Sequence, residues 1–480
     1  ADQVAKPNIW DGNKWVDLPI ADPASNKPQY PIVNPTVAKD KSATIYVALT
    51  SFRDFRCSDT LTSIFKNAKY PERVFVGLLH QMLPESTDES CLKTYCAVMR
   101  SYTTSKCPHK ENIRAVDSSS LDSRGPSTSR YMQHTMLRNE EFYLQLDSHS
   151  LLTKDWDVLM LEEWVATGNE YAVLSTYPPD VADKAKFESG GESVGTVPHL
   201  CASTFAHKGM VRNARAVPVS GLNSDGLRPR PILTTRWAPQ FSFSRSHLER
   251  KVPADPHLVN VYDGYDFSKY ARMWTRGYDV YTPSRVLLFH DYGRILGSKN
   301  AKQADAAAKP KQKYDPSNWQ NNGQSPVEKR QAYENGVYRV RMLLNMPDAP
   351  TDAKSLATLS IFGLGTRRTL DAFIDYTGVD VRRLTNGPSR CFGRGAAVRL
   401  VPFSGGGDAD VDLGDAWGMD AEKIPAAGQG VPLESGPVEW VSLDALWATN
   451  VAYTASRGSS LAPPSPVADM TGNSGETDET

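Results

Sequence analysis

The sequence predicts an α/β fold built on a mainly parallel, mixed sheet with helices on both faces. Short apolar segments rich in β-branched or aromatic residues alternate with segments of helical character, which is typical of a parallel sheet. Strands buried on both faces have nearly continuous apolar sequences. The expected strands are 44–50, 73–79, 112–116, 141–146 and 171–176, and the expected helices are 57–68, 89–100, 126–139 and 157–167.

The composition divides the chain into regions of different character. A proline-rich stem or arm at 1–40 precedes the domain at 41–296 that contains the expected strands. Lysine, alanine, glutamine and asparagine dominate 297–331, which indicates a flexible linker or insertion. A C-terminal helical extension follows at 332–403, and 404–480 is a largely irregular tail rich in glycine, proline and alanine.

The charge balance excludes some classes of partner. Lysine and arginine total 54 against 55 aspartate and glutamate, so no net field attracts nucleic acid or anionic membranes. No run approaches the roughly 18 consecutive apolar residues of a membrane-spanning helix. We therefore expect no nucleic-acid partner and no membrane segment, and an anionic ligand must be held by local charge.

The cysteines do not form an obvious pattern. Six cysteines are too sparse for a disulfide scaffold in 480 residues. Cys91, Cys96, Cys107 and His109 allow a zinc interpretation, but their gaps miss the tight pairs of structural zinc sites. We expect free thiols or one disulfide instead.

Polar segments follow several of the expected strands. Residues 50–54 follow the first strand, 117–124 the third and 147–149 the fourth. Because ligands of parallel sheets bind beyond the carboxyl ends of the strands, we expect these segments to face one crevice.

The segment Asp147-Ser148-His149 carries the clearest chemical signal. Residues i and i+2 of an extended segment point to the same side, so Asp147 and His149 form a chelating pair. A carboxylate, an imidazole and diphosphate oxygens suit manganese or magnesium, which offsets charge on a leaving diphosphate. His290, after the apolar segment 285–289, supplies a third ligand in this interpretation. In the alternative interpretation Asp147 caps a helix, His149 lies on the surface and His290 closes a core strand.

The residues around this segment resemble a known family, over about 44–380. They resemble the retaining N-acetylglucosaminyltransferases that modify polypeptide hydroxyproline or threonine. That family is distantly similar to the polypeptide N-acetylgalactosaminyltransferases, which share a Rossmann-like GT-A fold and bind manganese through an Asp-x-His pair and a distant histidine. The matching segments are Ser51-Phe-Arg-Asp54, Arg73-Val-Phe-Val-Gly77, Leu144-Gln-Leu-Asp-Ser-His149, Arg272-Met-Trp-Thr-Arg-Gly-Tyr-Asp279 and Gly363-Leu-Gly-Thr-Arg367.

The resemblance implies roles for single residues. It implies Asp147, His149 and His290 as metal ligands, and Arg130 and Asp266 as catalytic residues together with Asp147. The guanidinium group of arginine can donate two hydrogen bonds to phosphate oxygens, and a carboxylate can accept hydrogen bonds from the N–H and O–H groups of uracil or ribose. The implied contacts to the nucleotide, the diphosphate and the sugar are Thr50, Ser51, Arg53, Asp117, Arg124, Ser148, Tyr265, Arg272 and Tyr278.

One position departs from the family pattern. The family usually has Gly-Glu-Glu where this chain has Gly264-Tyr265-Asp266. Tyr265 thus replaces an acid expected near the donor sugar, and Asp266 retains part of the role. Hydrogen bonds to sugar hydroxyls discriminate strongly between sugars, so this change bears on the choice of donor.

The sequence thus predicts a metal-dependent retaining transferase that moves N-acetylglucosamine from UDP-GlcNAc to a protein hydroxyl, on hydroxyproline, threonine or serine. The alternatives are another UDP-sugar, galactose or N-acetylgalactosamine, or a non-catalytic nucleotide- or sugar-binding homologue. The first residue is alanine, which favours the Golgi lumen if an N-terminal anchor was removed, while the absence of Asn-x-Ser/Thr acceptors favours the cytoplasm.

Overall fold

The computed structural model describes most of the chain between residues 42 and 386. The described ranges are 8–10, 15–17, 37, 42–83, 88–102, 105–189, 196–214, 216–220, 231–292 and 322–386. The described residues all belong to one compact unit. The expected tail at 404–480, and most of the expected linker and lead-in, lie outside the described residues.

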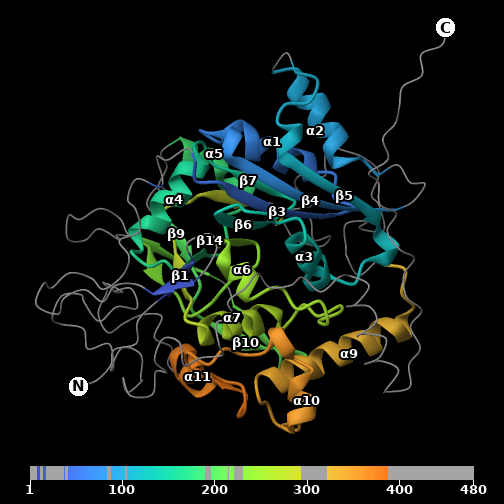
Figure 1. Ribbon diagram of the computed structural model, residues 1–480, viewed down its shortest axis with the longest axis vertical. Helices are drawn as coiled ribbons and strands as arrows, with labels where there is room; N and C mark the ends of the chain where they lie inside the picture. The colour runs from blue at the N-terminus through green and yellow to red at the C-terminus, as the bar shows by residue number, and fades with distance from the viewer. Residues whose placement is uncertain are drawn as a thin grey trace, which may run out of the picture. The chain divides into compact units, whose positions relative to one another are not determined.

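An eight-stranded mixed sheet forms the centre of this unit, in the order β13-β15-β8-β14-β6-β3-β4-β5. Figure 1 labels the successive strands β14, β6, β3, β4 and β5 of this sheet. β6, β3, β4 and β5 run parallel, and β14 is antiparallel to both of its neighbours. The predicted mainly parallel, mixed sheet is therefore confirmed. The strands are β3 (Ile45–Phe52), β4 (Val74–Met82), β5 (Ile113–Ser119), β6 (Phe142–Asp147), β8 (Ala172–Ser175), β13 (Ile232–Leu233), β14 (Phe241–Arg245) and β15 (Asp279–Thr282).

Helices cover both faces of this sheet. Alternate side chains of each strand point to opposite faces, so one strand contacts helices on both sides. Val47 and Leu49 of β3 belong to one buried cluster with Leu61 and Ile64 of helix α1. Tyr46 lies on the opposite face, where its hydroxyl donates a hydrogen bond to a carbonyl of α3. The helices flanking the parallel strands are α1 (Cys57–Asn67), α2 (Cys91–Arg100), α3 (Pro126–His134) and α4 (Trp156–Ala166).

Helix α3 is shorter than the sequence predicts. It ends at His134 rather than at 139, and Leu137 packs with Tyr46 and Tyr143 beneath the sheet. The helix begins after Gly125, whose φ of 94° is accessible to glycine, and Pro126 starts the first turn.

Several short two-stranded pairs complete this unit. The pair that matters for function joins β7 (Ser150–Leu152) to β16 (Leu288–His290), and β16 is shorter than the expected strand at 285–289 and shifted toward His290. The remaining pairs are β1 (Asn8–Trp10) with β2 (Trp15–Asp17), which lies within the expected irregular lead-in, β9 (Thr196–His199) with β12 (Val217–Ser220), β10 (Ser203–Phe205) with β11 (Val211–Asn213), and β17 (Val379–Asp380) with β18 (Thr385–Asn386).

The C-terminal helices share the core of the sheet domain. Phe373 of α11 (Leu370–Thr377) lies 5.0 Å from Phe267 and 5.7 Å from Trp274, between ring centroids. Both partners belong to α7 (Tyr265–Thr275), which α9 (Pro326–Leu343) also contacts. Helix α9 begins at Pro326, inside the range 297–331 that the sequence analysis expects to be a linker or insertion. The short helix α6 (His247–Lys251) is joined to α7 by the ion pair of Glu249 with Lys269, and α10 (Ala353–Ala357) follows α9 in the chain.

The cysteine expectation was wrong. Cys57 bonds to Cys91, and Cys96 bonds to Cys107, so the zinc interpretation of the same residues is excluded. Cys201 is also disulfide-bonded, and no cysteine of the described residues is free. The reason for the error is that α1 and α2 pack side by side, a contact that sequence spacing does not reveal.

We predict that Phe373→Ala destabilises the whole sheet domain by about 3–5 kcal/mol, because it opens a cavity among the aromatic rings of α7. Urea denaturation monitored by circular dichroism measures this. Val327→Ala in α9, where the side chain is 77% exposed, is the control and changes stability by less than about 0.5 kcal/mol. Equal effects of the two substitutions would contradict a shared core.

We predict that the two described disulfides contribute unequally to stability. Closing a longer loop removes more entropy from the unfolded chain, so the bond that spans 34 residues outweighs the one that spans 11. Replacing Cys57 and Cys91 by serine should cost about 4 kcal/mol, and replacing Cys96 and Cys107 about 3 kcal/mol. Denaturation of the two double variants measures the order, and the reverse order would contradict this reasoning.

Candidate active site

Three predicted metal ligands meet at the carboxyl end of the parallel strands. Asp147 ends β6, His149 lies between β6 and β7, and His290 ends β16. The pairing of β7 with β16 places Ser150 opposite His290, which brings the two histidines together. One ligand atom from each of the three side chains lies within 4.8 Å of the other two.

The three side chains of this cluster differ in exposure. His290 Nε2 is 3.2 Å from Asp147 Oδ2, and the rings of His149 and His290 are 4.5 Å apart at their centroids. The side chain of His290 is 7% exposed, whereas those of Asp147 and His149 are 27% and 24% exposed. A ligand can therefore approach Asp147 and His149, while His290 is held in the protein.

The protonation states suit a metal site. Burial raises the pKa of Asp147, but the hydrogen bond from His290 and the charge of Arg130 outweigh burial and lower this pKa to about 2. Burial lowers the pKa of His290, and its partner Asp147 opposes this only in part. At neutral pH the site thus offers an ionised carboxylate and a neutral imidazole, the forms that bind metal ions.

The donor set also fits a divalent metal ion chemically. One carboxylate oxygen and two imidazole nitrogens occupy part of an octahedral shell and leave positions for oxygen atoms of a ligand. Manganese accepts this mixture of nitrogen and oxygen ligands, whereas calcium prefers oxygen ligands alone. The cluster of Asp147, His149 and His290 can therefore hold manganese.

Arg130 and the start of α7 lie beside this cluster. Arg130 Nη2 is 3.4 Å from Asp147 Oδ1, and its guanidinium lies 5.3 Å from the ring centroid of Tyr265. Tyr265 is only 2% exposed, so its ring lies in the protein beneath Arg130. Asp266 is half-buried and accepts a 3.3 Å hydrogen bond from Asn213 Nδ2. Burial and the charge of Asp147 raise the pKa of Asp266 to about 7, although Arg130 opposes the shift.

Three predicted nucleotide contacts lie at the C-terminal end of β3 or just after it. Thr50 pairs in register with Asp147, and its buried hydroxyl has no hydrogen-bond partner within the described ranges. Ser51 is buried and donates to the carbonyl of Asp54. Arg53 makes a bidentate ion pair with Asp88, at 2.7 and 3.1 Å.

Two further predicted contacts lie in the second half of β5 and in the segment that follows it. The side chain of Asp117 is 62% exposed and 3.6 Å from His80 Nδ1. Arg124 Nη1 donates to the carbonyls of Leu121 and Ser123, at 3.2 and 2.9 Å. Both side chains are thus at the strand ends, as expected, but Arg124 is turned toward its own loop.

Three other predicted contacts are buried. Ser148 is 4% exposed and donates to Asp54. Arg272 is 2% exposed and lies 5.6 Å from the ring of Phe362, and Tyr278 is 1% exposed and shares a 2.8 Å hydrogen bond with His247 Nδ1. The C-terminal helices cover α7, which explains why Arg272 is buried rather than exposed in a sugar pocket.

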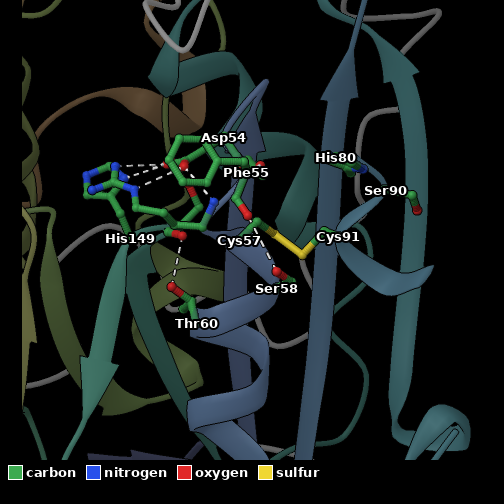
Figure 2. Close-up of a disulfide and its surroundings, with 12 residues drawn as sticks. Asp54, Phe55, Cys57, Ser58, Thr60, His80, Ser90, Cys91 and His149 are labelled. Atoms are coloured by element: carbon green, nitrogen blue, oxygen red, sulfur yellow. Dashed lines mark hydrogen bonds and ion pairs between the residues drawn. A yellow bond between two sulfur atoms is a disulfide. The ribbon is translucent and has the colours of Figure 1, made fainter. Parts of the chain in front are cut away.

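A group of charged residues next to the cluster was not among the predicted site residues. Figure 2 shows Asp54, in the turn before α1, pointing toward His149. Asp54 Oδ2 is 2.8 Å from His149 Nδ1, and Arg56 pairs with both Asp54 and Asp291. The only sequence signal was the position of Asp54 inside a motif at a strand end.

Comparisons with known proteins identify a family. A sequence model described as Glycosyltransferase (GlcNAc) matches residues 44–107 and 85–383, more than half of the 480-residue chain. No curated protein matches the chain.

Solved structures with detectable similarity have low identity. The structure of GalNAc-T7 with UDP, GalNAc and Mn²⁺ has 11% identity and a TM-score of 0.38, and the match covers 52% of this chain and 43% of that one. The mannosyltransferase PcManGT of Pyrobaculum calidifontis, with GDP-Man and Mn²⁺, has 12% identity, a TM-score of 0.32 and coverages of 67% and 80%. TarS of S. aureus has 14% identity and a TM-score of 0.31, and the match covers 62% of this chain and 72% of that one. The chain thus spans less than half the length of the first of these structures.

The family match defines the class of protein as a glycosyltransferase. The mixed sheet with helices on both faces agrees with the expected GT-A fold. Within this class, the chain belongs to the family described as Glycosyltransferase (GlcNAc). No helix among the described residues is long and apolar enough to span a membrane.

We predict that His290→Ala weakens binding of Mn²⁺ by more than about tenfold, because loss of a ligand costs at least as much as loss of a supporting hydrogen bond. Electron paramagnetic resonance measures free Mn²⁺ during a titration of the purified protein. His207→Ala, at an exposed histidine, is the control and leaves the affinity unchanged. Normal Mn²⁺ binding by His290→Ala would place the third ligand elsewhere.

Proposed function

We propose that the protein transfers N-acetylglucosamine from UDP-GlcNAc to a protein hydroxyl, on hydroxyproline, threonine or serine, with retention of configuration and with bound manganese. The observation that carries this proposal is the convergence of Asp147, His149 and His290 in a member of a glycosyltransferase family. The resemblance of the surrounding segments to the polypeptide-directed transferases supports the choice of sugar and acceptor.

The proposed reaction needs no protein nucleophile. The bond between the sugar C1 and the diphosphate oxygen breaks, the acceptor oxygen bonds to C1 on the same face, and the acceptor proton moves to the departing diphosphate. Manganese, when bound, offsets negative charge on the diphosphate. Asp147, His149 and His290 hold the metal in this scheme, while Arg130, 3.4 Å from Asp147, binds a diphosphate oxygen and stabilises its charge.

Asp266 and Asn213 are the polar groups that we propose for the donor sugar. They are hydrogen-bonded to each other at 3.3 Å, and the charges of Asp147 and Arg130 act on Asp266. A carboxyl and an amide side by side offer both acceptors and donors to sugar hydroxyls. Thr50, Ser51, Arg53 and Asp117 are the residues that we propose for the nucleotide end of the site.

A second candidate is the same reaction with galactose or N-acetylgalactosamine. The observation that favours it is Tyr265, which stands where the family has an acid and lies buried beneath Arg130. A different arrangement of hydrogen bonds at this point changes which sugar hydroxyls are recognised.

The disulfides support an oxidising compartment. Cys57–Cys91 and Cys96–Cys107 are of the kind that persist in secretory compartments and are rare in the cytosol. We therefore propose the Golgi lumen rather than the cytoplasm as the place of action, with acceptors on proteins that pass through it.

We predict that the protein hydrolyses UDP-GlcNAc slowly in the absence of an acceptor, and faster than UDP-GalNAc or UDP-galactose. Chelation of metal, or Asp147→Asn, should lower kcat at least about 100-fold. Several kcal/mol of charge stabilisation are lost, and each 1.36 kcal/mol of activation free energy changes the rate tenfold. Release of UDP measures the rate. Faster turnover of another sugar supports the second candidate, and tight UDP binding without turnover of any donor or acceptor supports a non-catalytic homologue.

A further inference from the structure

The buried carboxylate of Asp54 receives hydrogen bonds from several parts of the site. Asp54 is 4% exposed in the turn between β3 and α1. Its Oδ2 accepts from Ser148 Oγ at 3.0 Å and lies 2.8 Å from His149 Nδ1, as Figure 2 shows for His149. Its Oδ1 accepts from the backbone N–H of Arg56 at 3.0 Å and from the guanidinium Nε at 3.3 Å.

These contacts determine which ring nitrogen of His149 carries the proton. A carboxylate surrounded by N–H and O–H donors is an acceptor only, so His149 Nδ1 must donate. Nε2 is then the ring nitrogen that remains available to a metal ion. A carboxylate in this position also fixes the orientation of the ring.

The same network reaches the segment that carries His290. The guanidinium of Arg56 pairs with Asp291, and the backbone N–H of Asp291 donates to the carbonyl of His149 at 3.0 Å. The segments of both histidines are thus tied to one turn. His290 itself has no comparable support, because its buried Nδ1 lacks a hydrogen-bond partner among the residues that the structure describes.

Helix α1 keeps this turn in place. Thr60 Oγ1 donates to the carbonyl of Ser148 at 2.8 Å and accepts from the N–H of Ser150 at 3.0 Å. The disulfide of Cys57, the first residue of α1, joins the helix to α2 (Figure 2). Asp54 is therefore held by the backbone around it, and its position does not depend on the loop of His149 alone.

We propose that Asp54 is a positioning residue, which fixes the ring orientation and the Nδ1–H tautomer of His149 so that Nε2 points to the metal. Arg56 extends this support to Asp291 and the segment of His290. The role in metal binding rests on the metal site of the proposed function, whereas the role in orienting His149 is a property of the metal-free protein.

The test uses Asp54→Asn, which keeps the shape of the side chain and an oxygen acceptor for the backbone N–H of Arg56. Loss of a carboxylate behind a histidine ligand should raise the dissociation constant of Mn²⁺ by about 10–100-fold. Titration with Mn²⁺ alone, followed by electron paramagnetic resonance, measures the change, and the thermal midpoint verifies folding. Unchanged Mn²⁺ affinity in a folded Asp54→Asn protein overturns the proposal.

Asp59→Asn is the matched control. Asp59 is exposed on the first turn of α1 and close enough for its charge to act on Asp54. This variant removes one negative charge from the same region without removing the acceptor of His149. Equal losses of Mn²⁺ affinity in both variants would assign the effect to charge alone and overturn the proposal.

A metal-free readout separates this proposal from the proposed function. Nitrogen-15 spectra of histidine-labelled protein should show His149 as the Nδ1–H tautomer, and this signal should be lost or mixed in Asp54→Asn. An Nε2–H tautomer in the unmodified protein overturns the proposal whether or not Mn²⁺ binds. If the Nδ1–H tautomer depends on Asp54 but Mn²⁺ does not bind, the orienting role stands and the metal in the proposed function fails.

Discussion

The pairing of β7 with β16 is the contact on which the candidate site depends. It joins residues 150–152 to 288–290, with Ser150 opposite His290, and so brings together histidines that are far apart in the sequence. Asp147 lies at the same point because it is the last residue of β6, which pairs with β3 in the sheet. Without this pairing the Asp-x-His segment would be a two-ligand site, which binds a metal ion weakly.

Charges of both signs are concentrated around this point, and each is compensated locally. Arg130 stands beside Asp147, and Arg56 stands between Asp54 and Asp291. A buried charge without a partner is costly, so such alternation allows several ionised groups to share one partly buried region. The positive charge of Arg130 also prepares the site for an anionic diphosphate, which the nearly neutral net charge of the chain does not attract from a distance.

The sequence predicted the features that depend on local patterns. The apolar segment at 141–146 became β6, and Asp147 and His149 lie where its end was expected. Features created by packing between distant segments were missed. Asp54 forms its hydrogen bond with the ring of His149, which follows the end of β6. The Cys57–Cys91 bond forms because α1 and α2 pack side by side. Arg272 is buried beneath helices from the C-terminal region. Neither apolar periodicity nor spacing encodes such contacts directly.

The proposed function requires one metal ion between Asp147, His149 and His290 that also holds the diphosphate of a UDP-sugar. Anomalous X-ray diffraction at the manganese absorption edge, from crystals grown with Mn²⁺ and UDP, would locate this ion. We expect one manganese peak within coordination distance of Asp147, of Nε2 of His149 and of His290, and in contact with the diphosphate. A bound UDP without manganese at this point, or manganese bound to other residues, would contradict it.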